Sequence, residues 1–173
     1  ISILKLQIAI FQYIRHLTAY TDLLQENGYH CALSGKWHLG DSMTPQHGFS
    51  EWYTIGRGGC EYFHPDIVEN GNLEFKDGYV TDLIGENARN TIRKLAGKAA
   101  PFYLSVHFTA PHSPWDEKSH PEKYLDMYRD CSFEATPDLP IHPNQVKTCP
   151  YGTGERRKEL LRGYYAAITA MDY

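Results

Sequence analysis

Residues 29–40 read YHCALSGKWHLG, a short apolar run that ends in glycine, lysine, tryptophan and histidine. The compact first half predicts a strand over 29–34. In an extended segment, residues two apart point the same way, so we expect Lys36 and His38 to face one pocket while Trp37 packs on the other side. An ammonium beside an imidazole suits an oxyanion, because lysine keeps its charge near neutrality whereas histidine exchanges a proton there.

The segments on either side of this strand carry helix and turn signals. Thr18 is expected to cap a short helix that ends at Asn27-Gly28, where a left-handed residue can close the last turn. Residues 53–78 are rich in glycine and turn residues, which predicts an excursion over the surface. Within it, residues 69–72 read ENGN and predict the turn of a hairpin.

Two helices and a second strand are predicted further along the chain. A helix over 80–97 is indicated by apolar residues at helical spacing, namely Val80, Leu83, Ile84, Ala88, Ile92 and Leu95. The uncharged run PFYLSVHF over 101–108 predicts a strand buried on both faces, followed by the proline-bounded loop TAPHSPW. Residues 116–154 predict a long irregular connection. A closing helix follows, with an apolar side made of Leu160, Leu161, Tyr164, Tyr165, Ile168 and Met171.

This alternation of helices and buried strands predicts an α/β protein with a largely parallel sheet. In such sheets, ligands bind at the carboxyl ends of the strands. Lys36, His38 and His112 follow the two predicted strands and are expected to converge there, although more than seventy residues separate the first two from the third. His112 could then protonate a leaving oxygen while His38 serves the nucleophile.

Each of these residues also has an ordinary structural interpretation. A lysine after a strand is usually solvated, a tryptophan beside it usually belongs to the core, and His112 could simply satisfy a backbone carbonyl. His107 lies inside the predicted buried strand and is interpreted as a hydrogen-bonded core residue, not a metal ligand. The remaining histidines are interpreted as surface or packing residues.

Length and composition exclude several classes of protein. With 173 residues and 42% hydrophobic content, the chain suits one globular domain or a piece of one. Its net charge is −4 and its charged residues are dispersed, which disfavours nucleic acid and polybasic membrane contacts. No run approaches the roughly 20 apolar residues of a membrane span. The opening ISILKLQIAIFQYIRHL predicts a core or edge segment, or an amphipathic helix. The four cysteines are far apart and permit a disulfide without requiring one: Cys31, Cys60, Cys131 and Cys149.

Taken together, the motifs resemble those of the type I sulfatases. ENGYHCALSGKWHLG closely resembles the second signature of that family. Three later segments are similar to family segments in the same order: PQHGFSEWY, PFYLSVHFTAPHSPW and LRGYYAAITAMDY. The resemblance covers about residues 17–173 and leaves 1–16 unmatched. Residues 1–173 are therefore expected to form part of a single sulfatase catalytic domain.

This resemblance implies a three-layer α/β/α fold of the alkaline-phosphatase-like superfamily and hydrolysis of sulfate esters at a calcium-assisted site. Lys36 matches the lysine that contacts the sulfate. His38 matches the histidine that hydrogen-bonds the hydrated formylglycine and helps to collapse the sulfated intermediate. His112 matches the histidine beside the bridging oxygen, where it acts as general acid for the departing alcohol.

The chain departs from the family pattern at the nucleophile and at the metal. No cysteine lies in a C/S-x-P-x-R motif and Ser113 does not fit it either, so the formylglycine has no counterpart. The paired aspartates and the Asp-Asn pair that complete the calcium site are also missing, since Asp172 is followed by Tyr173. We therefore expect an internal fragment or a truncated gene model whose fold is incomplete, with no metal ligands of its own. Such a chain should bind an anion weakly without turnover.

The resemblance also bears on the substrate and the location. A sulfate ester is implied, with a sulfated sugar favoured over an aryl sulfate. Two alternatives remain open: a phosphodiesterase or phosphonate hydrolase of the same superfamily, and a non-catalytic module that binds sulfated glycans or a partner protein. The substrate-gripping loops would include residues 56–75 and 113–150, whose aromatic rings could stack on a sugar or simply pack. The family alone suggests a periplasmic, extracellular or lysosomal location.

Overall fold

The computed structural model of the chain describes residues 13–173 and divides into two compact units. The first contains the described residues up to Cys60 together with His64–Thr109, and the second contains Glu61–Phe63 and Ala110–Tyr173. Residues 1–12 hold most of the opening segment that was expected to be a core or edge segment or an amphipathic helix, and they lie outside the described part. Residues 13–17 form a turn and a bend.

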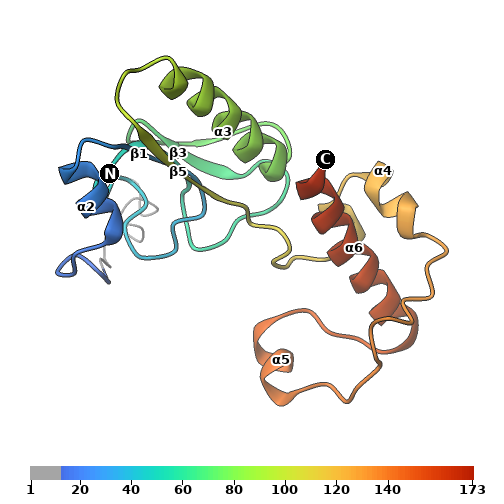
Figure 1. Ribbon diagram of the computed structural model, residues 1–173. Coiled ribbons are helices and arrows are strands. Elements are labelled where there is room, and N and C mark those ends of the chain that lie inside the picture. Colours follow the sequence, from blue (N-terminus) through green and yellow to red (C-terminus); the bar gives the residue numbers. More distant parts are fainter. Residues whose placement is uncertain (1–12) are drawn as a thin grey trace. The chain divides into compact units, whose positions relative to one another are not determined.

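A five-stranded mixed sheet forms the centre of the first unit (Figure 1). Its strands lie in the order β4-β3-β2-β1-β5, with β1 paired in parallel to both β2 and β5. The hairpin of β3 and β4 extends the sheet from β2 by antiparallel pairing. The bounds are β1 His30–Gly35, β2 Phe49–Ile55, β3 Asp66–Glu69, β4 Asn72–Phe75 and β5 Phe102–His107. The sheet was expected to be largely parallel, and three of its five strands, β2, β1 and β5, pair in this way.

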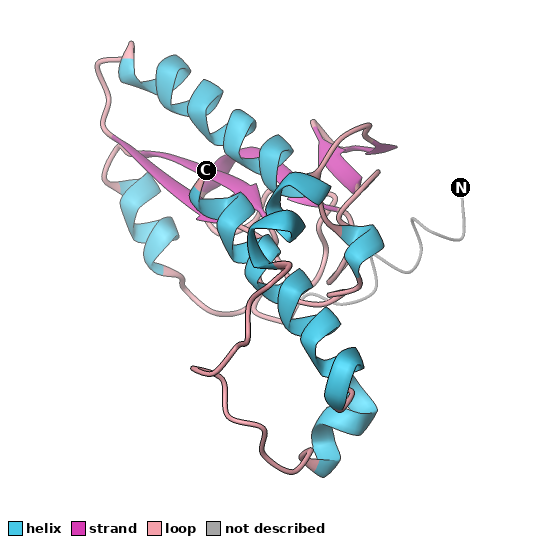
Figure 2. Cartoon of the chain, turned by 90° about the vertical axis from the view of Figure 1, so that its right-hand side faces the viewer, coloured by secondary structure: helices cyan, strands magenta, loops and turns pink. Residues whose placement is uncertain are grey.

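Helices α2 (Tyr20–Glu26) and α3 (Val80–Ala96) cover opposite faces of this sheet (Figures 1 and 2). The thiol of Cys31 donates to the carbonyl of Thr21 on α2 at 3.7 Å, whereas the hydroxyl of Ser34 donates to the carbonyl of Ile84 on α3 at 2.9 Å. Because successive side chains of a strand alternate between faces, these two contacts place the helices on different sides of β1. The expected α/β class is thereby confirmed.

An aromatic cluster packs on the α2 side of the sheet. The ring of Trp37 lies 5.2 Å from that of Trp52 and 6.0 Å from that of Phe49, both in edge-on geometry. Cys31 and Leu33 of β1 and Val68 of β3 complete the buried cluster. Edge-on aromatic pairs contribute about 0.5–1.5 kcal/mol beyond the burial of their surface. Trp37 therefore anchors the loop that follows β1, and its packing agrees with the sequence-based expectation.

The hairpin turn follows the prediction, whereas the chain before it does not. Asn70 and Gly71 connect β3 to β4 with φ angles of 51° and 75°, the positive values that a two-residue hairpin turn needs. However, β2 was not predicted, and residues 53–78 are not a surface excursion, because Tyr62, Ile67 and Val68 are fully buried. The run FSEWYTI is rich in aromatic and β-branched residues, which favour a strand. The glycine-rich sequence begins only after this run.

Strand β5 differs from its prediction. It was expected to be buried on both faces, yet among the described strands it pairs only with β1 and forms an edge, with Val106 36% exposed. Whether a strand lies at the edge or in the centre of a sheet depends on which other strands pair with it. A local apolar run does not contain that information.

Both helices of the first unit also differ in detail from what the sequence suggested. The cap of α2 is Ala19, not Thr18; the carboxylate of Asp22 accepts from the amide of Ala19 at 2.8 Å and supplies the capping interaction. Helix α3 has its predicted bounds, but Ile92 is 44% exposed, so its buried stripe is narrower than the apolar pattern.

The second unit is built around α6 (Gly154–Asp172). The connection expected to be irregular contains four short helical segments: η1 Glu117–Ser119, α4 Glu122–Leu125, η2 Asp126–Tyr128 and α5 Pro143–Thr148. The buried face of α6 is lined by small residues and one leucine, namely Leu160, Gly163, Ala166, Ala167 and Ala170, while Met171 is exposed. A Cβ atom at Gly163 would lie 1.9 Å from the carbonyl oxygen of Trp115, so this glycine permits the close approach of the two backbones.

All four cysteines are free thiols, so the permitted disulfides do not form in this structure. No helix within residues 13–173 has the length and apolar character needed to cross a membrane.

Replacing Gly35 by alanine tests the tightest backbone contact of the sheet. Gly35 has φ +119°, and a Cβ atom there would lie 2.0 Å from the carbonyl oxygen of His107. We expect G35A to lower the free energy of unfolding by about 3 kcal/mol, because backbone strain and overpacking add. Urea denaturation measures the change. G59A is the matched control, since a Cβ atom at Gly59 meets nothing within 4 Å, and an equal loss in both variants would contradict the prediction.

Candidate functional site

The carboxyl ends of β1, β2 and β5 lie at one edge of the sheet because the three strands run in parallel. The segments that leave this edge are 36–40, 56–60 and 108–109. In the first unit, these segments carry five side chains that can bind a ligand or exchange a proton: Lys36, His38, Arg57, Cys60 and Thr109. We take this edge as the candidate site.

The backbone of Lys36 is fixed by a reciprocal contact with His107. The amide of Lys36 donates to the carbonyl of His107 at 2.8 Å, and Nδ1 of the His107 ring donates to the carbonyl of Lys36 at 3.0 Å. The second bond agrees with the hydrogen-bonded role expected of His107, but the residue is exposed, so it does not belong to the core as the sequence suggested. The ends of β1 and β5 are thus joined where the candidate site begins.

Lys36 is the half-buried cation of this edge. Burial lowers the pKa of its ammonium, and the nearby thiol of Cys60 partly opposes that shift. Among residues 13–173, no carboxylate forms an ion pair with Lys36, whereas Lys76 and Lys94 each have a glutamate within 3.3 Å. A partly desolvated ammonium without a carboxylate is suited to bind an external anion.

Cys60 lies near this lysine, and Thr109 lies near Cys60. The Sγ of Cys60 is 4.0 Å from the Oγ1 of Thr109, which connects the segment after β2 to the segment after β5. Neither residue was predicted from sequence as part of the site. Cys60 was missed because β2 was not predicted, and Thr109 because its neighbour across the sheet was therefore unknown. Correct assignment of FSEWYTI as a strand would have pointed to the residues that follow it.

His38 is exposed on the same loop and has an uncommon backbone conformation. Its φ is 62°, in the left-handed region that non-glycine residues seldom adopt and that often marks functional positions. Its ring lies against Gly58, where a Cβ atom would be 3.6 Å from Cε1. The glycine leaves space on that side of the imidazole.

A second positive charge lies in the segment after β2. Nε of Arg57 donates to Oδ2 of the fully buried Asp66 at 2.8 Å, and this hydrogen bond raises the pKa of the guanidinium despite its partial burial. The Arg57 side chain is still 46% exposed. It therefore contributes a fixed positive charge to the edge, although its carboxylate partner neutralises much of it.

His112 belongs to the second unit and lies on a well-anchored loop. Its ring is exposed, and Nδ1 donates to the carbonyl of Ser113 at 2.8 Å, which leaves Nε2 as the nitrogen that can exchange a proton with a ligand. The hydroxyl of Tyr62 donates to the carbonyl of His112 at 2.8 Å, and Nε1 of Trp115 donates to that of Pro111 at the same distance. These bonds hold the loop on both sides of the imidazole.

Lys36 and His38 both lie in the segment that follows β1. However, the left-handed φ of 62° at His38 departs from the extended backbone on which the expected common pocket was based, so that pocket stays a prediction. The convergence of His112 with them stays a prediction, since it is part of the other unit.

The described residues do not fit a calcium centre. No group of three or more His, Cys, Asp or Glu side chains within residues 13–173 is arranged to bind a metal ion. The buried carboxylate of Asp66 is engaged by Arg57.

Comparison with known proteins is consistent across sequence and structure. The sequence model of the family described as Sulfatase matches residues 12–173. An N-acetylglucosamine-6-O-sulfatase of Bacteroides thetaiotaomicron is 35% identical over 98 residues, which are 56% of this chain and 17% of that protein. An ulvan-active sulfatase of Formosa agariphila is 32% identical over 162 residues, covering 87% of this chain and 29% of that protein.

A solved structure shares the fold. A protein from work on glycosaminoglycan metabolism by Bacteroides thetaiotaomicron has a TM-score of 0.73 at 19% identity, covering 96% of this chain and 38% of that one. The chain spans less than a third of the length of the two curated relatives named above. Because the family match extends over nearly every residue from 12 onward, the chain belongs to the sulfatase family.

Proposed function

We propose that this chain provides the sulfate-binding edge of a sulfuric ester hydrolase that releases sulfate from a sulfated sugar. The observation that carries the proposal is the half-buried ammonium of Lys36, which has no carboxylate partner among the described residues and lies where three parallel strands end. The sugar is suggested by the relatives, one of which is named for N-acetylglucosamine 6-O-sulfate and another for ulvan.

Lys36 binds the sulfate group in this proposal. Its ammonium donates charge-assisted hydrogen bonds to sulfate oxygens and offsets the negative charge that a sulfate ester carries throughout the reaction. The reciprocal bonds between Lys36 and His107 keep the lysine backbone in place. Binding then costs little reorganisation of the loop.

The two imidazoles move protons in this proposal. His38 lies next to Lys36 in the chain and is exposed, so it can accept or return a proton at the nucleophile side of the sulfate. With the His112 ring doubly protonated, Nε2 gives its proton to the sugar oxygen as the bond from sulfur to that oxygen breaks, while Nδ1 keeps its bond to the Ser113 carbonyl. An alcohol then leaves instead of an alkoxide. The resemblance assigns the nucleophile to a formylglycine and adds calcium, and neither fits the residues of this chain.

Sulfate titration tests the binding role of Lys36. We expect a dissociation constant of roughly 1 mM, about −4 kcal/mol, with the ring signals of His38 shifting in NMR spectra of the imidazoles. K36Q should weaken binding about tenfold or more, because it removes a charge-assisted hydrogen bond. K94Q is the matched control, since Lys94 is exposed and paired with Glu51. If His38 does not respond to sulfate, or if both variants bind equally, Lys36 does not form the site.

The same titration has an expected pH dependence. Burial lowers the pKa of Lys36, so its ammonium loses a proton at a lower pH than an ordinary lysine. Sulfate affinity should be constant below that pKa and decrease as the pH rises through it, with the midpoint below the usual lysine value. Affinity that stays constant to the ordinary lysine pKa would show that another cation binds the anion.

Turnover by residues 1–173 alone is expected to be absent. None of the four cysteines lies in the sequence context from which the family nucleophile arises, so no group is prepared to attack sulfur. Purified chain incubated with 4-nitrophenyl sulfate should release nitrophenol no faster than buffer. Hydrolysis that is present in the wild type and absent in K36Q would contradict this prediction. Hydrolysis of a phosphodiester, but not of the sulfate ester, would favour the alternative activity within the superfamily.

A further inference from the structure

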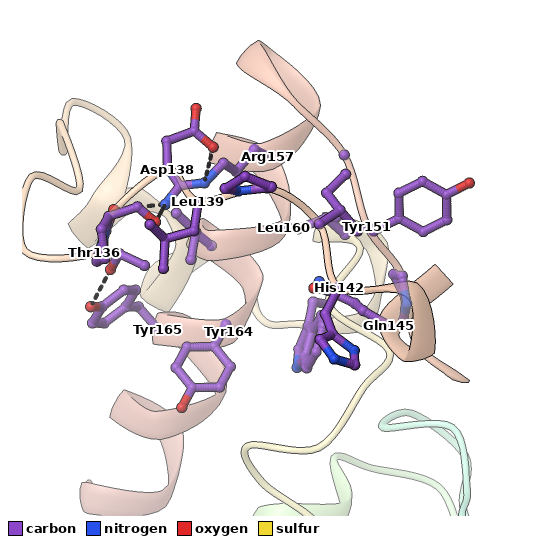
Figure 3. Close-up of a pocket in the computed structure, with 17 residues that line it drawn as sticks. Thr136, Asp138, Leu139, His142, Gln145, Tyr151, Arg157, Leu160, Tyr164 and Tyr165 are labelled. Carbon is purple, nitrogen blue, oxygen red and sulfur yellow. Dashed lines mark hydrogen bonds and ion pairs between the residues drawn. The ribbon is translucent and has the colours of Figure 1, made fainter. Parts of the chain in front are cut away.

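A pocket of about 630 Å³ opens in the second unit between α6 and residues 136–152 (Figure 3). It has no part in the chemistry proposed above, because Lys36, His38 and His112 do not line it. Its size is within the range of small-molecule sites. Aromatic rings and prolines form much of the wall, namely Trp115, Tyr151, Tyr164, Tyr165, Pro137, Pro140 and Pro150.

Arg157 supplies the charge in this wall. Its Nη2 donates to the carbonyls of Thr136 at 2.7 Å and Pro137 at 3.1 Å, while Nε pairs with Asp138 at 3.2 Å (Figure 3). No hydrogen bond from Nη1 is found within the described part of the chain. The Arg157 side chain is 20% exposed, whereas that of Asp138 is 67% exposed. Solvent around the carboxylate therefore weakens this ion pair. The guanidinium is thus oriented in advance, with one edge open to an acidic ligand.

The aromatic rings of the pocket are also held in place. The ring centroids of Trp115 and Tyr164 lie 5.9 Å apart in edge-on geometry. The indole N–H of Trp115 donates to the carbonyl of Pro111. The hydroxyl of Tyr165 lies 3.2 Å from that of Thr136. These contacts fix rigid apolar surfaces without long flexible side chains, which reduces the entropy lost when a ligand binds.

Polar groups complete the lining on the side of α5. Nδ1 of His142 accepts from the amide of Asn144 at 3.1 Å, so the neutral ring carries its proton on Nε2 and can donate it. The amide side chain of Gln145 also lines the pocket and can donate or accept. The pocket therefore combines one cation and its carboxylate partner Asp138 with several aromatic rings and a few neutral hydrogen-bonding groups.

We propose that this pocket binds one acidic sugar unit of a glycan. A pyranose ring presents C–H groups on its faces, which suit the aromatic and proline surfaces, and hydroxyls at its edge, which suit His142 and Gln145. Its sulfate or carboxylate group accepts from the open edge of Arg157. The choice of a sugar rests on the proposed function, whereas the acidic group follows from the arginine.

Other ligand classes fit the lining less well. A purely hydrocarbon ligand would remove water from the guanidinium without replacing its hydrogen bonds, which is costly. A nucleic acid or polyphosphate would place several negative charges against a single cation that already has an acidic neighbour. One negative charge on an amphipathic ring matches what the residues offer.

Fluorine NMR of the full chain labelled with 5-fluorotryptophan tests this proposal. The chain has three tryptophans, and only Trp115 lines the pocket, while Trp37 and Trp52 belong to the core of the first unit. Titration with a chondroitin 4-sulfate tetrasaccharide should shift the Trp115 signal saturably and leave the other two unchanged. Unsulfated chondroitin tetrasaccharide separates the contribution of the carboxylate from that of the sulfate, and neutral chitotetraose should bind at least tenfold more weakly than either.

Variants localise the binding. R157Q should weaken binding of the sulfated tetrasaccharide about tenfold, whereas K158Q removes the same charge from an exposed residue outside the pocket lining and should change it less than twofold. Because Arg157 also anchors residues 136 and 137, Y151A provides a second test: Tyr151 is 45% exposed, lines the pocket and should cost severalfold in affinity without disturbing the fold.

The outcome can be separated from that of the proposed function. K36Q should leave the Trp115 response intact even if sulfate binding at Lys36 is lost. A missing Trp115 response, equal weakening by R157Q and K158Q, or equal affinity for chitotetraose would each overturn the proposal. A response that disappears in K36Q would also overturn it, because the glycan would then bind at the sulfate edge alone.

Discussion

The close approach of Gly35 to His107 is the constraint on which the candidate site depends. A side chain at position 35 would collide with the His107 carbonyl, so only glycine lets the end of β1 lie this near to β5. From that point the backbone of Lys36 is held by two hydrogen bonds to His107. The lysine is therefore positioned by backbone geometry, and its side chain remains available for an anion.

Local sequence was sufficient where one segment determines its own structure. Helix α3 and the Asn70-Gly71 turn could be predicted because helical periodicity and positive φ preferences are local properties. Lys36 and His38 could be singled out for the same reason, since their spacing and their place after a strand are visible in the sequence. The ordered motifs around them then indicated the family, which the family match confirms.

Features that depend on partners could not be predicted in the same way. The edge position of β5 reflects which strands find it, and its uncharged run does not distinguish an edge from a centre. The absence of β2 from the prediction had a larger effect, because Cys60 and Thr109 become neighbours only when β2 and β5 lie in the same sheet. The pocket beside Arg157 was likewise hidden, since its lining comes from a connection that has little periodicity.

The charges of the two units have different roles because their surroundings differ. Lys36 is partly desolvated and has no carboxylate partner among the described residues. A bound anion therefore offsets the free-energy cost of burying its charge. Arg157 already has carbonyl and carboxylate partners that fix the orientation of its guanidinium. An anion therefore binds a donor that is already oriented. A sulfate group alone offers few contacts and should bind weakly at Lys36. Selection among sulfated compounds must then come from contacts with the rest of the molecule, and binding energy from such remote contacts can also be used to position the reacting group.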